Sequence, residues 1–393
     1  MNSKEYKYRA IDLFAGAGGL SLGFESEGFS IPLAIEKDTW AKNTYNLNHI
    51  DKNCIEADIT TLPDDFFQKY NGNVDVVMGG PPCQGFSIAA SNRRKEFDER
   101  NFLYRQFLRV VKLVAPKMVL IENVKEFIKY HLPNGELLIK DIVETLENLG
   151  YVCSYSVFEL KDYGIPQDRK RTFLMAAKID LVQTLDLHEL LKPFLKSPIT
   201  LGEAISDLPQ VEPYQYKEGD VLEYTKQPQN EFQMQLRNKC DKVYNHIPMQ
   251  HTAKTVEKFK FIMAHSKEEM PDDLKSRVRG NVNEISKSAF SQNHRVMDAN
   301  KISPTITASF YSSFIHPNQP RNLTVREAAR VQTFPDTFIF TGKKTTLSKK
   351  LLSKKGIIED LHLDQFNQVG NAVPPMMAGI LAKICKTILG TKV

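Results

Sequence analysis

Hydrophobic and polar positions alternate regularly in the first half of the chain. From residue 9 to about 178, short apolar runs bounded by Gly, Pro or Asn alternate with amphipathic stretches. The apolar runs predict buried strands: AIDLF (10–14), IPLAIE (31–36), CIEAD (54–58), VDVVMGG (74–80), MVLIEN (118–123) and VCSYSVFEL (152–160). The amphipathic stretches predict helices: TWAKNTYNLNH (39–49), FLYRQFLRVVKLV (102–114) and GELLIKDIVETLENLG (135–150). This alternation predicts a doubly wound α/β fold, with a mostly parallel sheet and helices on both faces.

Beyond about residue 190 the periodicity weakens, and the sequence becomes rich in Gln, Asn, Lys and Pro. We expect a second, less regular domain there, from 191 to 365. Helical patterning returns in LTVREAARVQTF (323–334) and in AVPPMMAGILAKICKTIL (372–389), whose Pro pair suits a helix N-terminus. The first domain is therefore expected to comprise residues 1–190 and 366–393.

The composition is that of an ordinary globular protein, with 41% hydrophobic and 25% charged residues among 393. The five cysteines are odd in number and scattered, and no pair has the spacing of a metal site. The N-terminus lacks the apolar segment of a secretory signal. We therefore expect a cytoplasmic protein with no transmembrane segment and no bound metal.

The placement of charge is more informative than its total of +5. Basic residues concentrate in three stretches, 237–260, 275–295 and 342–355, with the acidic run EEMPDD between the first two. Such surfaces are usually only solvated, but three in one half of the chain favour a polyanionic partner such as a phosphate backbone.

A glycine-rich turn, DLFAGAGGLSLGF, joins the first predicted strand to a helix, as in folds that bind a ligand at a helix N-terminus. Gly16 and Gly18 fit the dinucleotide pattern G-x-G-x-x-G, but its third position is Ser21. Glu36 and Asp58 follow the next two strands, and acids there suit a ribose and a cationic ligand better than a pyrophosphate. The turn therefore favours S-adenosylmethionine over NAD, with a purely structural turn as the alternative.

One cysteine, Cys83, stands in the loop GGPPCQGFS that follows the fourth predicted strand. Pro81 and Pro82 fix the backbone before it, and its position after a strand places it in the same crevice as the glycine-rich turn. A cysteine there can act as a nucleophile if a positive neighbour or a helix N-terminus stabilises its thiolate. Without such help, a lone cysteine is an inert small hydrophobe.

Polar residues near the ends of later strands complete a candidate site. Glu122 and Asn123 end the fifth predicted strand, where a carboxylate can donate a proton or merely cap a turn. Gln167, Arg169 and Arg171 alternate along GIPQDRKRTFLMAAK and are expected on one face of an extended segment. Inward-facing arginines would bind a phosphate or a base oxygen and lower the pKa of the cysteine, whereas solvated arginines would do neither.

Together these stretches resemble the motif series of the DNA (cytosine-5)-methyltransferases, particularly the bacterial restriction-modification type. The motifs are, in order, DLFAGAGGLSLGF, GGPPCQGFS, ENV, QDRKR, RNLTVREAARVQTFP and QVGNAVPP. The resemblance spans the chain from Asp12 to the final helix. It implies that the first domain is a Rossmann-like S-adenosylmethionine-binding catalytic domain. The smaller second domain would recognise the DNA target, with a variable region at about 200–300.

The resemblance also implies a mechanism. The Cys83 thiolate would add to C6 of a cytosine flipped out of duplex DNA, which makes C5 nucleophilic toward the methyl group. Glu122 would protonate the ring at N3, and Arg169 and Arg171 would support the base. Asn123 would shape the loop that carries the cysteine. Loss of the C5 proton and elimination of the cysteine would complete the reaction.

Each ligand has its own set of implied residues. S-adenosylmethionine would contact Phe14, Gly16, Gly18 and Leu20 at its methionine end, Glu36 at the ribose, Trp40, Asp58 and Ile59 at the adenine, and Asn371 and Val373 of the last motif. DNA would contact Gln84 and Ser87, and also Arg93 and Arg94 in the loop after Ser87, IAASNRRKEFDERNFL, which resembles the family's mobile flap. A lysine-rich insertion at 343–355 departs from the family pattern, and it either touches DNA or is merely solvated.

Three other functions fit parts of the sequence. A tRNA cytosine-5 methyltransferase of the same fold typically has Pro-Phe-Thr after the Cys-Gln pair, where this chain has Gly-Phe-Ser. A catalytically silent DNA-binding relative would lack the cysteine or the cofactor turn, and an NAD-dependent oxidoreductase is disfavoured by Ser21. We expect a monomeric cytoplasmic enzyme, nucleoid-associated when bound to duplex DNA. By resemblance, it would pair functionally with a cognate restriction endonuclease.

Overall fold

The chain forms two compact units. The computed structural model describes residues 7–82, 103–212, 214–217, 219–266, 269–275, 277–278, 281–285 and 294–390. Unit 1 comprises Met1–Pro198 and Ala372–Val393, and unit 2 comprises Ile199–Asn371.

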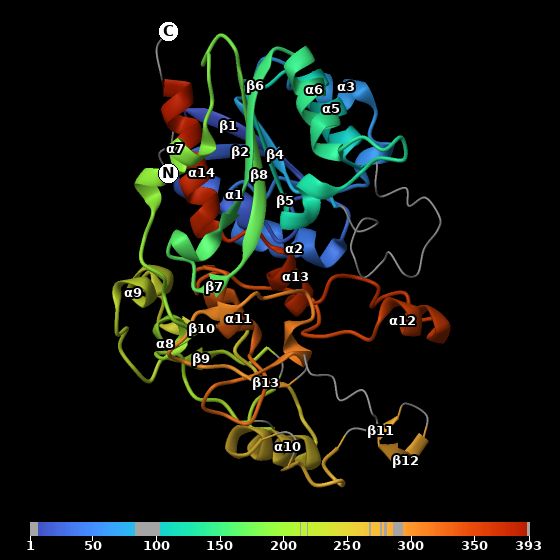
Figure 1. Cartoon of the computed structure of the whole chain (residues 1–393), viewed down its shortest axis with the longest axis vertical. Helices are drawn as coiled ribbons and strands as arrows, with labels where there is room; N and C mark the ends of the chain where they lie inside the picture. Colours follow the sequence, from blue (N-terminus) through green and yellow to red (C-terminus); the bar gives the residue numbers. More distant parts are fainter. Residues whose placement is uncertain are drawn as a thin grey trace. The chain divides into compact units, whose positions relative to one another are not determined.

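Unit 1 is built on one seven-stranded sheet, whose strands are β1 (Tyr8–Leu13), β2 (Phe29–Glu36), β3 (Cys54–Glu56), β4 (Val76–Gly79), β5 (Met118–Val124), β6 (Tyr151–Glu159) and β8 (Lys170–Lys178). Their order is β3-β2-β1-β4-β5-β8-β6 (Figure 1). The first five are parallel neighbours, whereas β8 runs antiparallel to β5 and β6. The strand order reverses at β1, and such a switch point opens a crevice at the carboxyl ends of the strands.

Helices cover both faces of this sheet (Figure 1). They are α1 (Gly19–Ser26), α2 (Thr39–Asn48), α3 (Asp64–Gln68), α5 (Leu103–Val114), α6 (Leu138–Asn148), α7 (Leu187–Leu191) and α14 (Pro375–Gly390). One face packs against α1, α7 and α14 in a core that includes Phe24 and Met377. The other face packs against α3, α5 and α6 in a core that includes Phe107 and Ile142. The predicted doubly wound α/β fold is confirmed.

Unit 2 contains mostly short elements, as its weak sequence periodicity indicates. Its described helices are α8 (Leu201–Ile205), α9 (Glu231–Arg237), α10 (Ala253–Ala264), α11 (Val325–Val331), α12 (Lys349–Lys355) and α13 (Gln365–Asn371). Its described strands are β9 (Leu222–Glu223), β10 (Lys242–Val243), β11 (Arg277–Val278), β12 (Asn281–Ile285), β13 (Arg295–Val296), β14 (Ser303–Pro304) and β15 (Phe314–Ile315). β9 pairs with β10 and β11 with β12 in antiparallel ribbons, and β13 pairs with β15 in parallel.

Buried ion pairs around α11 organise the interior of unit 2. Arg321 donates to both carboxylate oxygens of Glu327, at 2.8 and 2.7 Å. Arg330 lies in α11, where its guanidinium donates to Asp336 (2.6 Å) and to Asp207 (3.0 Å). Both arginines are at most 1% exposed, so each needs these anionic partners to offset its lost hydration.

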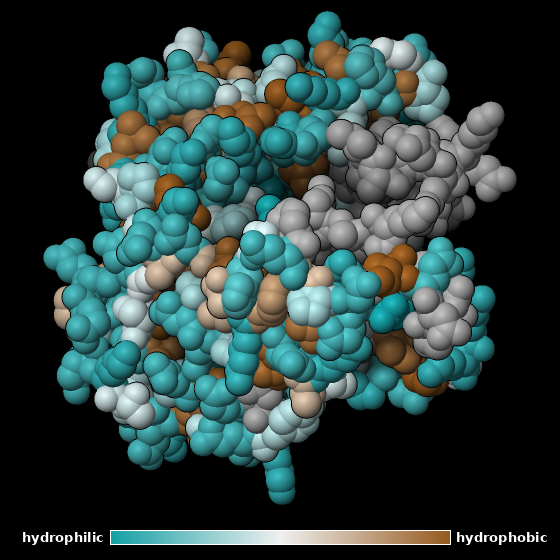
Figure 2. Space-filling model, turned by 60° about the horizontal axis from the view of Figure 1, so that its bottom comes forward, coloured by the Kyte–Doolittle hydropathy of each residue, from teal (hydrophilic) through white to brown (hydrophobic). Residues whose placement is uncertain are grey.

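One stretch of the described residues, Gln365–Gly390, is long and apolar enough by length and composition to cross a membrane. However, 72% of its apolar window is buried inside the protein, and its α14 part is a core helix of unit 1. On the face shown in Figure 2, hydrophobic residues form scattered patches among hydrophilic ones. The apolar character of α14 is therefore explained by its packing against the sheet.

Candidate active site

Three of the predicted site residues of unit 1, Phe14, Glu36 and Glu122, lie at the carboxyl ends of parallel strands. Phe14 follows β1, Glu36 ends β2, Gly80 follows β4, and Glu122 lies near the end of β5. Because these strands are neighbours in the order β2-β1-β4-β5, the four positions lie along one edge of the sheet. Phe14 and Glu36, predicted for the cofactor, and Glu122, predicted for the substrate base, thus share this edge.

The glycine-rich turn after β1 has left-handed backbone angles, with φ of 61° at Phe14, 56° at Gly16 and 95° at Gly18. A Cβ added at Gly16 would meet nothing within 4 Å, so the backbone is open to a ligand there. Glu36 accepts hydrogen bonds from Gly16 N and Asp38 N, both at 2.8 Å. Burial raises the pKa of Glu36, although these bonds oppose the shift. The carboxylate braces the turn, and its further lone pairs suit ribose hydroxyls.

Two aromatic residues that the sequence did not single out lie against this turn. Tyr45 in α2 and His49 at its C-terminal end stack with ring centroids 3.8 Å apart. A Cβ at Gly18 would lie 2.0 Å from His49 Nε2 and 2.7 Å from Tyr45 Cδ2, so only glycine fits. His49 Nδ1 lies 2.7 Å from Glu25 Oε2 in α1. The i, i+4 spacing of the pair puts both rings on one helix face, but it does not say which element that face meets.

Asp12 in β1 is joined to the same aromatic pair through a serine. Ser21 Oγ donates to Asp12 Oδ2 (2.6 Å), and the Tyr45 hydroxyl donates to Ser21 Oγ (2.9 Å). Burial raises the pKa of Asp12 to about 7, although the hydrogen bonds from Ser21 oppose the shift. With 1% of its surface exposed, Asp12 supports the turn from within the fold.

Asp58, predicted to bind the adenine, caps the short helix η1 (Ile59–Thr61) that follows β3. Its carboxylate accepts from Thr60 N (3.0 Å), and Lys37 Nζ lies 2.5 Å from Oδ2. Partial burial would raise the pKa of Asp58, but the contacts with Lys37 and Thr60 outweigh it and lower the pKa to about 2. Asp58 is therefore an anionic acceptor at neutral pH.

The other residues predicted for the cofactor differ in exposure. Trp40 is half-buried in the first turn of α2. Leu20 and Ile59 are 4% and 3% exposed and pack into the cores on opposite faces of the sheet. Val373 is 9% exposed in unit 1, whereas Asn371 is the last residue of unit 2. Only part of the predicted set therefore presents side-chain surface.

Glu122 lies beside the start of the loop after β4. A Cβ added at Gly80 would lie 3.1 Å from Glu122 Oε2, and Arg171 Nε on the neighbouring strand β8 lies 2.9 Å from Glu122 Oε1. Asn123 Nδ2 donates to Pro81 O (2.9 Å), which ties the loop to β5. Burial lowers the pKa of Arg171, and Glu122 opposes that shift. The Glu122 carboxylate is thus held between a guanidinium and the loop.

The segment expected to be one extended strand is interrupted at Arg169. β7 (Gln167–Asp168) ends before it and β8 begins after it, because Arg169 N donates to Gln167 O (2.9 Å) in a turn. Gln167 and Arg169 are 0% and 1% exposed. Arg169 Nη2 donates to Ala372 O (3.3 Å) in the segment that leads to α14, and burial lowers its pKa. The ion pair with Glu122 is made by Arg171.

Five predicted site residues lie outside the described residues: Cys83, Gln84, Ser87, Arg93 and Arg94. The described cysteines are free thiols: Cys54, Cys153, Cys240 and Cys385. Burial raises the pKa of Cys153 and Cys385 to about 12, so these thiols stay protonated at neutral pH. The described residues contain no cluster of three or more His, Cys, Asp or Glu suited to a metal ion, and metal-free chemistry stays a prediction.

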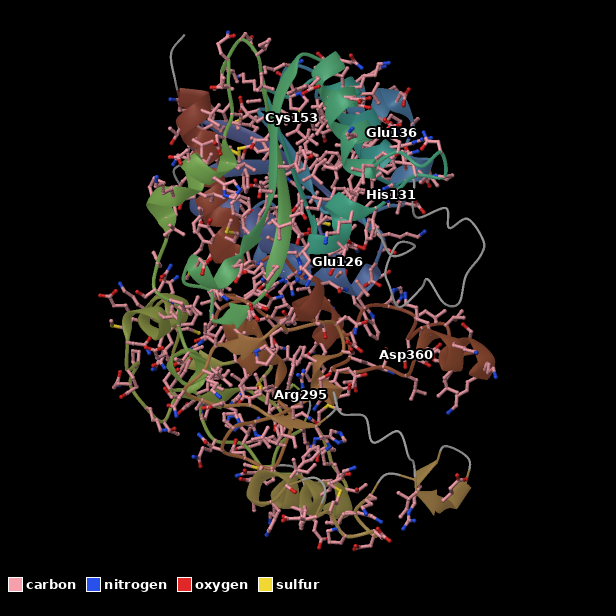
Figure 3. All side chains as sticks on the ribbon, in the orientation of Figure 1. Glu126, His131, Glu136, Cys153, Arg295 and Asp360 are labelled. Atoms are coloured by element: carbon pink, nitrogen blue, oxygen red, sulfur yellow. The ribbon has the colours of Figure 1, made fainter. Side chains whose placement is uncertain are left out.

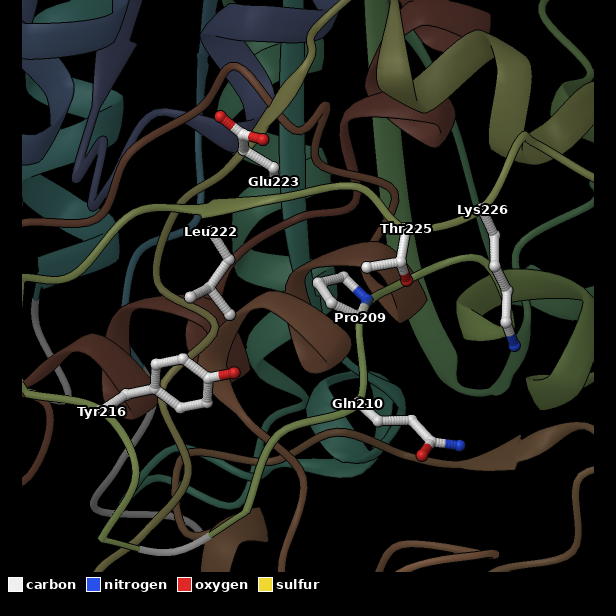
Figure 4. Close-up of a pocket in the computed structure, with 7 residues that line it drawn as sticks. All are labelled: Pro209, Gln210, Tyr216, Leu222, Glu223, Thr225 and Lys226. Atoms are coloured by element: carbon white, nitrogen blue, oxygen red, sulfur yellow. The ribbon is translucent and has the colours of Figure 1, made fainter.

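A pocket of about 490 Å³ lies within unit 2 and contains none of the predicted site residues (Figure 4). Leu222 and the Tyr216 ring point toward the same space, whereas Lys226 and Gln210 point away from it. The lining is Pro209, Gln210, Tyr216, Leu222, Glu223, Thr225 and Lys226. Most of these side chains are exposed, so the pocket is a surface feature of the region predicted to recognise the DNA target.

Comparison with known proteins identifies the family. The model of the C-5 cytosine-specific DNA methylases matches residues 8–387. The type II methyltransferase M.DdeI of Desulfomicrobium norvegicum is 41% identical over 377 residues, which cover 95% of this chain and 87% of the relative. The type II methyltransferase M1.HphI of Haemophilus parahaemolyticus is 33% identical, with coverage of 95% and 85%.

Solved structures agree with this match. A prophage-encoded candidate DNA modification methyltransferase of E. coli superposes with a TM-score of 0.73 and 25% identity, covering 98% of this chain and all of the other. The S. pombe Dnmt2 methyltransferase, at 16% identity, covers 98% of this chain and 99% of its own with a TM-score of 0.60, and so shares the fold. The chain belongs to the C-5 cytosine-specific DNA methylase family, as a DNA cytosine-5 methyltransferase of the type II restriction-modification type.

Proposed function

We propose that the enzyme methylates C5 of a flipped-out cytosine in a specific duplex DNA sequence through a covalent bond between Cys83 Sγ and cytosine C6. The observation that carries this proposal is the position of Glu122, which is paired with Arg171 and lies next to Gly80, at the start of the loop that contains Cys83 in the sequence. A proton donor beside a loop with a thiol fits addition to a ring that must be protonated at N3.

The bonds in the proposed reaction balance without a metal or redox partner. The Cys83 thiolate forms a bond to C6, while the ring takes a proton at N3 from Glu122 and C5 becomes nucleophilic. C5 then takes the methyl group, and the sulfonium that carried it would leave as a neutral thioether. The C5 proton leaves to a base, the Sγ–C6 bond breaks, and N3 returns its proton to Glu122, which restores the ring, the thiolate and the carboxyl group. Arg171 orients the Glu122 carboxyl group, and Asn123 holds the loop through Pro81.

The family implies S-adenosylmethionine as the methyl donor, which supplies an electrophilic methyl group on a sulfonium. The residues at the sheet edge fit this ligand, because the backbone is open at Gly16 and the carboxylates of Glu36 and Asp58 can accept hydrogen bonds. We assign to it the set predicted from the sequence: Phe14, Gly16, Gly18, Leu20, Glu36, Trp40, Asp58, Ile59, Asn371 and Val373.

The proposal extends to the DNA partner and the cell. Gln84, Ser87, Arg93 and Arg94 would contact DNA, and residues 191–365 would choose the sequence. The catalytic domain would comprise 1–190 and 366–393. The enzyme would act as a monomer in the bacterial cytoplasm and protect DNA against a cognate restriction endonuclease.

Transfer of labelled methyl from S-adenosylmethionine tests this function. Purified wild-type protein should label duplex DNA, Cys83→Ser should abolish labelling, and Glu122→Gln should reduce it by about 10²- to 10⁴-fold, the usual contribution of a general acid. Cofactor binding by both variants, measured calorimetrically, would show that they are folded. Labelling of tRNA alone, or undiminished transfer by Cys83→Ser, would refute the proposal.

A further inference from the structure

The lysine-rich insertion of unit 2 forms the short helix α12 at the outer end of a loop (Figure 1). Hydrogen bonds tie the loop to the start of α13. Gln365 N donates to Lys343 O, and Thr346 N donates to Asp364 Oδ2, both at 3.0 Å. Leu352 is 1% exposed and anchors the helix. α12 is thus held in place by the hydrogen bonds between its loop and the start of α13, and by the buried side chain of Leu352.

Six lysines of this insertion fall into two groups. Lys343 Nζ lies 2.6 Å from Oδ1 of Asp360, which is labelled in Figure 3, and Lys344 Nζ donates to Pro248 O (2.8 Å). The other four are exposed, and within the described part of the chain none of their side-chain ammonium groups makes an ion pair or a hydrogen bond: Lys349, Lys350, Lys354 and Lys355. The first group holds the loop, and the second group presents its charge to solvent.

Helix stability accounts for only two of the four exposed lysines. Lys354 and Lys355 lie in the last turn, where cations interact favourably with the helix dipole, and Gly356 ends the helix with φ 67°. Lys349 and Lys350 occupy the first turn, where a positive charge opposes the dipole. Four like charges on a seven-residue helix also repel one another. The four exposed lysines therefore lower the stability of α12 itself, while they concentrate positive charge on it.

We propose that α12 binds the phosphate backbone of duplex DNA, independently of base sequence. This inference rests on the proposed function, because the polyanion that this enzyme must hold is DNA. A seven-residue helix is about 10 Å long, and duplex DNA carries one charge per roughly 1.7 Å of its axis, so four ammonium groups have phosphates within reach. Lysine suits this contact because its flexible stem needs no fixed geometry.

The salt dependence of DNA binding tests the proposal. In one variant the four exposed lysines of α12 become Gln: K349Q, K350Q, K354Q and K355Q. In a matched control, four exposed lysines of unit 1 become Gln: K52Q, K112Q, K140Q and K192Q. Each variant lowers the formal charge from +5 to +1 (5 − 4). Duplexes of random sequence are titrated between about 50 and 200 mM NaCl, the range in which phosphate contacts dominate binding.

The α12 variant should bind DNA about tenfold or more weakly at the lowest salt, and the slope of log K against log salt should become shallower by about 2 to 4, at roughly 0.9 per lost contact. The control should change the slope by less than about 1. Vesicles that contain phosphatidylserine are titrated in parallel. Equal slopes for the two variants would overturn the proposal, as would an α12 variant that binds the vesicles more weakly but keeps the DNA affinity of the wild type. If the α12 variant shows the expected change in slope but the wild type transfers no methyl group, the proposed function is refuted and the α12 contact with DNA still holds.

Discussion

Two buried carboxyl groups, Asp12 in unit 1 and Glu327 in unit 2, have opposite pKa shifts although each is at most 2% exposed. Burial raises the pKa of Asp12 to about 7, because the hydrogen bonds from Ser21 come from neutral groups and offset only part of the lost hydration. Burial acts on Glu327 in the same direction, but the guanidinium of Arg321 outweighs it and holds the pKa well below its ordinary value. The charge of the neighbouring group therefore decides the sign of the pKa shift.

This difference separates a cluster of paired charges in unit 2 from a cluster beside the proposed cofactor turn in unit 1. In unit 2, the buried charged groups are paired with one another, and each pair offsets the hydration that its members lose. In unit 1, Asp12 lies beneath the proposed cofactor turn and changes charge near neutral pH. Substitutions in each cluster should therefore have different effects.

Replacing Glu327 by Gln has the largest expected effect. It leaves the guanidinium of Arg321 buried without its charge partner, which should cost about 3–5 kcal/mol of unfolding free energy. Hydrogen exchange of the α11 amides measures this locally, since the two units need not unfold together. The control Asp298→Asn removes an exposed pair with Lys301 and should cost less than about 1 kcal/mol. Equal effects of the two variants would contradict the account.

Gly18→Ala should cost unit 1 about 2–3 kcal/mol and weaken S-adenosylmethionine binding, because its Cβ would overlap His49 and Tyr45. The matched variant Gly28→Ala has a similar φ of 84° but would meet nothing within 4 Å, so only backbone strain of about 1 kcal/mol remains. Calorimetry with S-adenosylmethionine should separate the two variants. Unimpaired binding by Gly18→Ala would show that the turn does not hold the cofactor.

The two carboxyl groups should also give opposite pH dependence. The folded chain keeps a proton on Asp12 up to about pH 7, whereas the unfolded chain loses it near pH 4, so stability falls as pH rises between these values. Between pH 5 and pH 7, the unfolding free energy of the wild type should fall by about 2 kcal/mol relative to that of the Asp12→Asn variant. The contribution of Glu327, whose pKa is lowered, is present above about pH 4.5 and is lost as pH falls below it. Parallel pH profiles for wild type and Asp12→Asn would contradict the shift.

Tyr45→Phe has the smallest expected effect. It removes the hydroxyl that donates to Ser21 Oγ but keeps the ring against Gly18, which should cost about 1 kcal/mol. Hydrogen exchange of the α1 amides measures it. Tyr155→Phe, at a 41% exposed position, should have no effect. A loss as large as that of Gly18→Ala would show that the hydroxyl, rather than the ring, holds the turn.

The strands could be predicted well from the sequence because buried parallel strands are short apolar runs. The polar residue that follows each apolar run then marks the end of the strand. It could not predict the turn at Arg169, since alternation looks the same whether or not the backbone is interrupted there. No local pattern shows that Tyr45 and His49 lie against Gly18, or that Arg321 and Arg330 are buried. Both features depend on tertiary packing.

The central claim is the covalent step at Cys83. A fluorine at C5 of cytosine cannot leave as a proton, so the proposed reaction should stop with the cysteine still bonded to C6. Random-sequence duplexes in which 5-fluorocytosine replaces cytosine should, with S-adenosylmethionine, yield a DNA adduct that peptide mass spectrometry places on Cys83. The Cys83→Ser variant should yield none. Adducts on another cysteine, or methylation of unmodified DNA without any adduct from the fluorinated duplexes, would contradict the account.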